Sequence, residues 1–364
     1  MGELTPRDYT INAETIRRTD EAGLGSADWY RSPIPRKQLK ELMQRRDGPA
    51  LRDTAIWAGA LIVSGVAGYF AWGTWWAVPC FLVYGVLYGG ASDSRWHECG
   101  HRTAFRTTWM NDVVYEIACF MILREPTVWR WSHTRHHTDT IIVGRDPEIA
   151  VPRPPDILGL VLNIFALKSS YVAIKSVIFH AAGRLTETEL TFIPESERRY
   201  VYRTARIWLA ILGAVVLIAI GTRSILPLMY VGLPTLYGGW FVILVGLTQH
   251  AGLAEDVLDH RLNTRTVTMN PVFRFLYWNM NYHIEHHMFP TVPYHALPKL
   301  HAAMKHDTPP PYPNILAAYR EIIPTLARQV KDPAYHVVRP LPVNARPYAD
   351  YEPFANQGGM TDAR

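Results

Sequence analysis

The sequence predicts an all-α membrane protein, with four transmembrane helices in two hairpins and a cytoplasmic helical cap that holds three clusters of histidines. Three observations lead to this prediction. Four long apolar runs interrupt an otherwise polar chain of 364 residues. Lysines and arginines gather on one side of these runs, and the histidine clusters fall on that same side. No stretch shows the alternation of apolar and polar residues that is typical of strands.

The four apolar runs occur in two pairs. Runs of roughly 20 apolar residues are long enough to cross the hydrocarbon core of a bilayer. The only charge among them, Arg206, stands near the start of the third run, where a long side chain can reach the interface. Each pair is joined by a very short connection, so each predicts a hairpin. The runs are residues 54–73, 75–91, 205–221 and 225–249.

The flanking charges orient these hairpins. Residues 1–53, the N-terminal arm, carry ten lysines and arginines, whereas the first hairpin turn carries none and the second carries only Arg223. By the positive-inside rule both turns lie outside, and both termini lie in the cytoplasm together with residues 92–204 and everything after 249. The net charge of +5 is spread along the segments that flank the membrane, so nucleic-acid binding is not expected.

We divide the chain into three parts. The N-terminal arm, residues 1–53, precedes a membrane and histidine-bearing domain, residues 54–310. A C-terminal cytoplasmic segment, residues 311–364, follows, and we expect its proline-rich end from 338 onward to be disordered. Residues 155–183 are apolar but interrupted by two lysines, so we expect one or two helices that lie in the membrane interface.

Eight of the 15 histidines stand in three tight clusters, HECGH, HTRHH and HIEHH. Residues three and four apart share a face of a helix, so the imidazoles of each cluster converge. A ninth histidine ends the fourth apolar run. This number exceeds what one ion binds, so we predict two metal ions, and imidazole alone leaves iron, zinc, copper and nickel open. The predicted ligands are His97, His101, His133, His136, His137, His250, His283, His286 and His287.

Polar neighbours of the clusters are candidates for orienting these ligands, because metal-bound imidazoles usually donate their other N–H group to a carboxylate or carbonyl. The candidates are Glu98, Asp139, Asp146, Asn281 and Glu285. For Glu98 and Glu285, an ordinary helix-capping or solvated role is equally open. The other histidines lack the spacing and are assigned no role: His180, His260, His295, His301, His306 and His336.

The clusters and their surroundings resemble the integral-membrane fatty acid desaturase and hydroxylase family, which carries HxxxH, HxxHH and HxxHH boxes. HECGHRTAF and WRWSHTRHHTDT, followed by RDPEI, are similar to plant oleate-type desaturases. NYHIEHHMFPTVPYHALPKL is similar to the third box of sphingolipid and front-end desaturases. The resemblance covers residues 50–310. It implies two non-haem iron ions, O2 as co-substrate and the eight clustered histidines as iron ligands, with His250 at an extra ligand position.

The resemblance implies an O2-dependent oxidoreductase that attacks an unactivated C–H bond, and a fatty acyl desaturase of lipid metabolism is the first hypothesis. A hydroxylase, monooxygenase or O- or N-demethylase of a small alkyl- or methyl-bearing metabolite is the alternative. Desaturation and hydroxylation differ by small offsets in geometry, so the residues do not choose between them. A metal-binding membrane transporter or sensor would need polar residues within the spans, and these spans have almost none.

The sequence contains no recognisable redox motif besides the histidines. Its three cysteines form no CxxC pair, and no CxxCH, HPGG-type haem motif or glycine-rich dinucleotide fingerprint occurs. We therefore expect electrons from a separate ferredoxin or cytochrome with its reductase. Small ferredoxins are generally acidic, so we expect a basic docking surface, such as residues 198–206 or 261–274.

Overall fold

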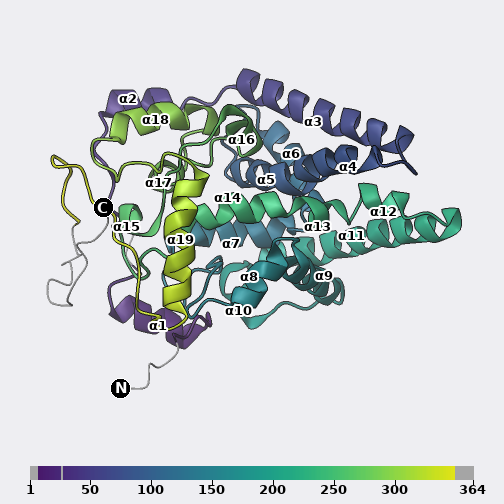
Figure 1. Ribbon diagram of the computed structural model, residues 1–364. Coiled ribbons are helices and arrows are strands. Elements are labelled where there is room, and N and C mark those ends of the chain that lie inside the picture. Colours follow the sequence, from purple (N-terminus) through teal and green to yellow (C-terminus); the bar gives the residue numbers. More distant parts are fainter. Residues whose placement is uncertain (1–6, 26–27, 349–364) are drawn as a thin grey trace.

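The computed structural model describes residues 7–25 and 28–348, and all regular elements within these residues are helices (Figure 1). The pairing of extended chain there is confined to two isolated bridges, Thr266 with Tyr282 and Val267 with Tyr312. The all-α prediction is therefore confirmed. The predicted disorder of 338–364 falls largely on residues 349–364, which lie outside the described part of the chain.

The helices follow one another with short connections. The first six are α1 (Ala13–Glu21), α2 (Arg36–Leu42), α3 (Asp47–Phe70), α4 (Ala77–Gly85), the π-helix η1 (Val86–Gly90) and α5 (Ala91–Gly100). The central ones are α6 (Thr108–Met121), α7 (Pro126–Thr138), α8 (Ile157–Asn163), α9 (Leu167–Ala181), α10 (Glu187–Phe192) and α11 (Glu195–Thr222). The last are α12 (Leu226–Tyr230), α13 (Pro234–Gly238), α14 (Trp240–His250), α15 (His260–Asn263), α16 (Pro271–Leu276), α17 (His283–Met288), the 3-10 helix η2 (Tyr294–Ala296), α18 (Leu297–Met304) and α19 (Ile315–Gln329).

Two helical stretches among the described residues are long and apolar enough to cross a membrane. They are Arg36–Phe70, which contains α3, and α11. The pair α8 and α9 passes the same test only if it is taken as one span, and it is bent by 84°. Water disfavours exposed apolar side chains, and these helices expose many of them. The most exposed on α3 and α11 include Ile62, Val63, Phe70, Leu217 and Ile220.

The second and fourth predicted spans are not uniform α-helices. Residues 77–100 run as α4, η1 and α5, with the π-helical turn in the middle. The segment predicted as one span, 225–249, is instead three short helices. Gly232 has φ +97°, which α-helices do not contain, and Pro234 has no N–H group to continue a helix. The sequence pattern showed the apolar character of this segment but not these breaks.

The breaks in this segment lie where two chain segments approach very closely. A Cβ atom on Gly89 of η1 would meet the carbonyl oxygen of Pro234 at 2.7 Å, and one on Gly85 would overlap the ring of Tyr237. Small residues at such crossings let helix backbones touch. This contact brings α13, and α14 after it, against the helix that leads to the first histidine cluster.

A buried arginine fixes the helix that carries this cluster. Arg95 of α5 is 0% exposed and donates to the backbone carbonyl of Leu276 at 2.9 Å. Its guanidinium lies 4.9 Å from the ring centroids of both Trp57 and Trp278. Trp57 in turn donates to the carbonyl of Leu87 at 2.8 Å. These contacts join α5 to α3 and to the end of α16, and the cation–π contacts add to the packing.

The tips of α3, α4, α11 and α12 lie at one end of the molecule, and α1, α2, α15 and α18 lie at the opposite end (Figure 1). Asp307, a buried carboxylate, is one of the residues that tie the N-terminal arm to this second end. Asp307 accepts hydrogen bonds from the hydroxyls of Tyr30 at 2.7 Å and Ser32 at 2.6 Å. It also accepts the backbone N–H of Arg346 at 2.9 Å and lies 3.4 Å from the Arg261 guanidinium.

Replacing Asp307 with alanine is expected to lower the free energy of unfolding by about 3 kcal/mol, because Tyr30, Ser32 and the buried Arg261 lose a shared charged partner. The released arm should also expose the peptide bond after Arg31 to trypsin. Thermal unfolding and limited proteolysis of purified protein measure both effects. Glu21→Ala, which removes an exposed partner of Arg17, is the control. Equal behaviour of the two variants would contradict the proposed anchor.

Candidate metal centre

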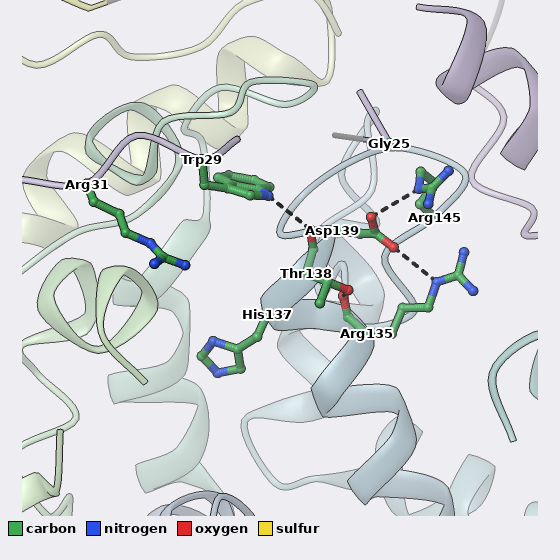
Figure 2. Close-up of a pocket in the computed structure, with 8 residues that line it drawn as sticks. All are labelled: Gly25, Trp29, Arg31, Arg135, His137, Thr138, Asp139 and Arg145. Carbon is green, nitrogen blue, oxygen red and sulfur yellow. Dashed lines mark hydrogen bonds and ion pairs between the residues drawn. The ribbon is translucent and has the colours of Figure 1, made fainter. Parts of the chain in front are cut away.

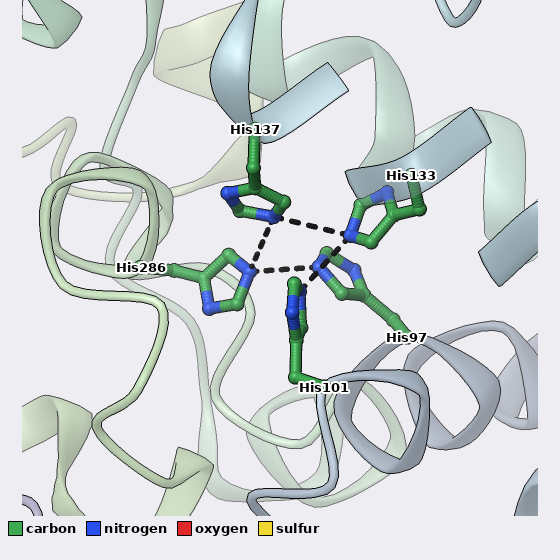
Figure 3. A group of neighbouring side chains, drawn as sticks. All are labelled: His97, His101, His133, His137 and His286. Atoms are coloured by element: carbon green, nitrogen blue, oxygen red, sulfur yellow. Dashed lines mark hydrogen bonds between the residues drawn. The ribbon is translucent and has the colours of Figure 1, made fainter. Parts of the chain in front are cut away.

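Five imidazoles from three helical segments converge at their Nε2 atoms (Figure 3). They belong to His97 and His101 at the end of α5, His133 and His137 of α7, and His286 of α17. Neighbouring Nε2 atoms lie 2.8 Å apart for His97 and His286, and 3.1 Å apart for His101 and His133. The distance is 3.1 Å for His133 and His137, and 3.2 Å for His137 and His286. We call these five residues the first histidine group.

A second histidine group lies beside the first. His136, His250 and His287 bring ring nitrogens within 4.8 Å of one another. His283 joins them, with its Nε2 atom 3.1 Å from that of His287 and 3.2 Å from that of His250. The rings of His137 and His287, one from each group, stack with centroids 4.4 Å apart. All nine histidines predicted from the sequence are thus gathered into two adjoining groups.

The HxxHH spacing explains how one helix serves both groups. Residues four apart point in nearly the same direction, whereas the residue between them is rotated about the helix axis. In α7 the outer pair, His133 and His137, faces the first group, and His136 faces the second. In α17 the assignment is reversed: His286 faces the first group, and the outer pair, His283 and His287, faces the second. Each of the two helices therefore contributes histidines to both groups.

Acceptor atoms behind three of the rings fix which nitrogen faces the group. The Nδ1 atom of His133 lies 2.9 Å from Glu148, that of His136 lies 2.8 Å from Asp146, and that of His250 lies 2.8 Å from the carbonyl of Asn263. An ionised carboxylate or a carbonyl only accepts, so Nδ1 carries the proton in each case. The Nε2 lone pair is left to point into the group, as metal ligation requires.

Burial disfavours the charged form of these rings, although Asp146 and Glu148 outweigh it at His136 and raise the pKa of that ring. Desolvation first, and neighbouring imidazoles next, lower the pKa values of His97, His137 and His286 well below the ordinary value. Behind them, burial opposes the charge of Glu148, but His133, His136 and Arg124 together outweigh it and lower the pKa of Glu148 to about 2. Imidazoles that donate from Nδ1 to a charged carboxylate form the donor arrangement that metal ions select.

The spacing of the nitrogens fits metal ions. Imidazole nitrogens bind first-row metals at roughly 2.0–2.1 Å, so two of them at a right angle around one ion stand about 2.9 Å apart. The contacts of 2.8–3.2 Å within both groups agree with that spacing. Nine nitrogens exceed the coordination number of a single ion, and they are divided into two groups. The donor set therefore fits two ions.

Comparison with known proteins identifies the family. The sequence profile described as fatty acid desaturase matches residues 73–318, which is more than half of the chain. The chain belongs to the fatty acid desaturase family. Because desaturase-family proteins carry apolar helices and this chain has them, it associates with membranes.

Individual relatives of this desaturase-family protein are distant. A Delta(12) fatty acid desaturase from Calendula officinalis is 25% identical over 260 residues, which cover 63% of this chain and 65% of the relative. A Delta(12)-fatty-acid desaturase from Arabidopsis thaliana is 24% identical over 265 residues, covering 65% and 67%. An acyl-lipid (8-3)-desaturase from Thraustochytrium is 24% identical over 376 residues, covering 85% and 82%. The chain thus spans slightly less than two thirds of the Calendula relative.

The polar residues predicted to orient ligands divide into two sets in this desaturase-family protein. Asp146 contacts a group histidine, as described above. Glu98 Oε1 lies 3.6 Å from Nδ1 of His286, which is too long for a hydrogen bond, and neither buried atom has another partner. Burial raises the pKa of this Glu98 carboxyl to about 8. The two atoms therefore face each other across a short gap.

The other three candidates contact the surrounding scaffold instead. Asp139 pairs with Arg135 at 3.1 Å and with Arg145 at 3.0 Å. The Asn281 side chain donates to the carbonyl of Val267 at 2.8 Å. The carboxylate of Glu285 contacts Thr266 and His301, each at 2.5 Å. His301, which was assigned no role, is thereby tied to the third cluster.

Sequence reasoning missed three residues that contact the ligand imidazoles. Glu148 lies behind His133, the Thr140 hydroxyl lies 3.2 Å from Nδ1 of His287, and the His260 ring lies 5.1 Å from that of His287. Glu148 stands two residues after Asp146, so the acidic RDPEI stretch was an available signal. The position of His260 in the sequence gives no sign of a role, because His260 approaches the second histidine group only in the tertiary structure.

A cavity of about 380 Å³ opens onto both histidine groups. His97 and His133 of the first group and His136, His250 and His283 of the second line it. Its other walls mix apolar side chains with charged ones, and its far part reaches the bend between α8 and α9. The apolar and aromatic lining includes Trp96, Trp129, Val151, Val242, Leu247 and Leu253. The polar lining includes Asp93, Arg124, Arg153, Asn163, Ser169, Gln249 and Glu255.

Replacing Glu148 with glutamine is expected to weaken metal retention by about 10- to 100-fold, which is typical when a partner behind a ligand is changed. The amide carries no charge and loses the preference for the Nδ1–H form of His133. Metal content after a timed challenge with a chelator measures the effect. Glu14→Gln, on an exposed side chain of α1, is the control and should retain metal like the wild type. Unchanged retention in Glu148→Gln would remove Glu148 from the account.

Proposed function

We propose that this protein is an O2-dependent, membrane-bound di-iron oxidoreductase that desaturates the fatty acyl chain of a lipid. The single observation that supports it most is the pair of adjoining histidine groups at the inner end of a ligand-sized cavity. Membership of the fatty acid desaturase family supports iron and O2, and the relatives named desaturases support an acyl substrate.

In this proposal each histidine group holds one iron. His97, His101, His133, His137 and His286 hold the first, and His136, His250, His283 and His287 hold the second. Bound iron supplies the reduction of O2 that oxidation of an unactivated carbon requires. The chain's own residues orient the imidazoles through Glu148 and Asp146, and burial of the rings excludes water from their metal-facing side.

Substrate reaches the histidines through the cavity in this proposal. The bend between α8 and α9 forms one part of the cavity wall, and the two helices expose large apolar side chains around it, among them Leu158, Phe165 and Tyr171. Such a surface favours contact with lipid. An acyl chain that leaves the bilayer at this bend would meet the apolar walls formed by α14 before it reaches the histidines.

One observation favours a second candidate function. Arg124 lies between the rings of Trp96 and Trp129, at 4.8 and 4.3 Å, and pairs with Asp93 at 3.1 Å. Arg153 and Glu255 also line the cavity and pair at 3.3 Å. Charged groups in the wall of this cavity suit a polar substrate. Oxidation of a small alkyl- or methyl-bearing metabolite is therefore the alternative function.

Expression in a host that lacks its own desaturases tests the first proposal. The fatty acid profile should gain an unsaturated chain with the wild type and none with His286→Ala, because the first group then loses a ligand. His306→Ala, on an exposed side chain, is the matched control and should behave like the wild type. An unchanged profile with the wild type, together with conversion of an added N-methyl or alkyl metabolite, would favour the alternative.

We also propose that the chain crosses the membrane several times, with the histidines and both termini in the cytoplasm. The end of the molecule that carries α3, α4, α11 and α12 has few charges, and the opposite end is rich in lysine and arginine. The broken segment 225–249 then crosses as α12 to α14 packed on α4 and η1, because protein contacts satisfy its interrupted backbone.

Reporter fusions test this orientation. Fusions after Gly73 and Arg223 should report the outside, and fusions after Ala150 and Leu300 should report the cytoplasm, because the charged segments stay inside. Each fusion is compared with the same reporter placed at the N-terminus, which should report the cytoplasm. An external signal at Ala150 would contradict the proposed orientation.

Electrons come from a separate carrier in this proposal. Removal of two hydrogens from the substrate supplies two of the four electrons, and two of the four protons, that convert O2 to two waters. The remaining two electrons come from a ferredoxin or cytochrome with its reductase, and two protons come from water. No CxxC pair or dinucleotide fingerprint occurs in the sequence, which supports this assignment.

A further inference from the structure

A second cavity, of about 430 Å³, approaches the histidines from the N-terminal arm (Figure 2). Of the nine group histidines, it is lined by His137 alone, which does not line the 380 Å³ cavity described above. We call the second cavity the arm funnel. Its lining comes from the arm, from the end of α7 and from the loop after it: Gly25, Trp29, Arg31, Arg135, His137, Thr138, Asp139 and Arg145.

We propose that the arm funnel is the docking surface for a small acidic electron-transfer protein, in which Arg31 and its basic surroundings bind the carrier and Trp29 marks the point of closest approach to the histidine groups. This inference rests on the proposed function, because only a redox centre needs such a carrier. Each docked carrier is oxidised by one electron, so two docking events supply the two electrons of one turnover.

The charges at the funnel favour an acidic partner. Arg135 and Arg145 share Asp139, and Arg145 also reaches Asp20 at 2.5 Å. Arg31 is exposed and makes no ion pair within the described residues. The three arginines and the two aspartates named here therefore carry a net charge of +1. Further along the chain, residues 36–46 add five exposed lysines and arginines against one acid, Glu41. Such surfaces steer acidic proteins to the site.

The funnel wall is built before any partner arrives. Residues 29–32 alternate in direction along extended backbone: Trp29 and Arg31 face the funnel, and Tyr30 and Ser32 face Asp307. The Arg261 guanidinium lies 3.6 Å from the centroid of the Tyr30 ring. This anchoring lowers the ordering cost of docking, because residues 29–32 are held in place before a partner arrives.

A continuous stack of rings joins this wall to the histidine groups. The indole of Trp29 stacks on His260 with centroids 4.3 Å apart and planes 8° apart. The His260 ring lies 5.1 Å from His287, and the His287 ring stacks on His137. The Trp29 Nε1–H group also donates to the carbonyl of Thr138, next to His137, at 3.0 Å. The funnel wall is therefore connected to both histidine groups through a short series of ring contacts.

The two basic segments predicted from the sequence fit docking less well. In residues 261–274, the side chains of Arg261 and Arg265 are 0% exposed and are used in internal ion pairs. Residues 198–206 line neither cavity that reaches the histidines. Arg203, for example, is exposed and stacks on Tyr200. Its charge matches that of Arg31, which makes it a suitable comparison.

The test measures binding of a plant-type [2Fe–2S] ferredoxin to the iron-loaded full chain in nanodiscs of neutral lipid. Arg31→Glu should raise Kd about tenfold at low ionic strength and much less at high ionic strength, because exposed charges are screened. Arg203→Glu should change Kd by less than about twofold. Trp29→Leu should slow anaerobic oxidation of the reduced ferredoxin, followed by its visible absorbance, and Trp29→Phe should preserve most of the rate.

Each other outcome has a defined meaning. Failure of the wild type to bind the ferredoxin, or equal effects of Arg31→Glu and Arg203→Glu, overturns the docking proposal. An effect of Arg31→Glu that occurs only in nanodiscs of anionic lipid assigns Arg31 to headgroups and overturns it too. Stoichiometric dithionite bypasses docking when it reduces the enzyme before O2 is admitted: in this single turnover, Arg31→Glu should desaturate an acyl lipid like the wild type. If the wild type with dithionite forms no product, the proposed desaturase function fails, whereas the binding comparison still decides the docking site.

Discussion

The structure depends on one constraint, the convergence of nine imidazole nitrogens in the protein interior. Such groups are costly to bury unless something satisfies their lone pairs. Carboxylates and carbonyls behind the rings hold Nδ1 protons on His133, His136 and His250, so the Nε2 lone pairs face one another. In our proposal two iron ions satisfy the lone pairs on the inner side of this arrangement, and the surrounding helices bring the nitrogens together.

The rest of the fold can be understood as support for this convergence. Arg95, fully buried between two indoles, sets α5, and the close approach of Gly89 to Pro234 sets α13 and therefore α14. The 380 Å³ cavity and the arm funnel then reach the histidines from different sides. In our proposal substrate uses the first and electrons use the second, so neither partner obstructs the other.

The sequence predicted the helical class and every member of both histidine groups, because HxxxH and HxxHH spacings act within single helices. Their role as ligands stays a prediction. The breaks at Gly232 and Pro234 were missed, since hydropathy averages over them. Glu148 was missed although it stands in the acidic RDPEI stretch beside Asp146, and His260 was missed because it meets the ligands only through tertiary contacts. Arg261 was read as surface, although the fold buries it against Asp259 and Asp307.

Mössbauer spectroscopy of the full chain, loaded anaerobically with 57Fe, tests the central claim most directly. Two histidine groups of different composition predict two irons per chain in two distinguishable sites of equal population. The first group offers five imidazoles and the second offers four, so the two sites should give separate quadrupole doublets. A single iron per chain in one environment, or zinc that fills both groups and resists exchange for iron, would contradict the account.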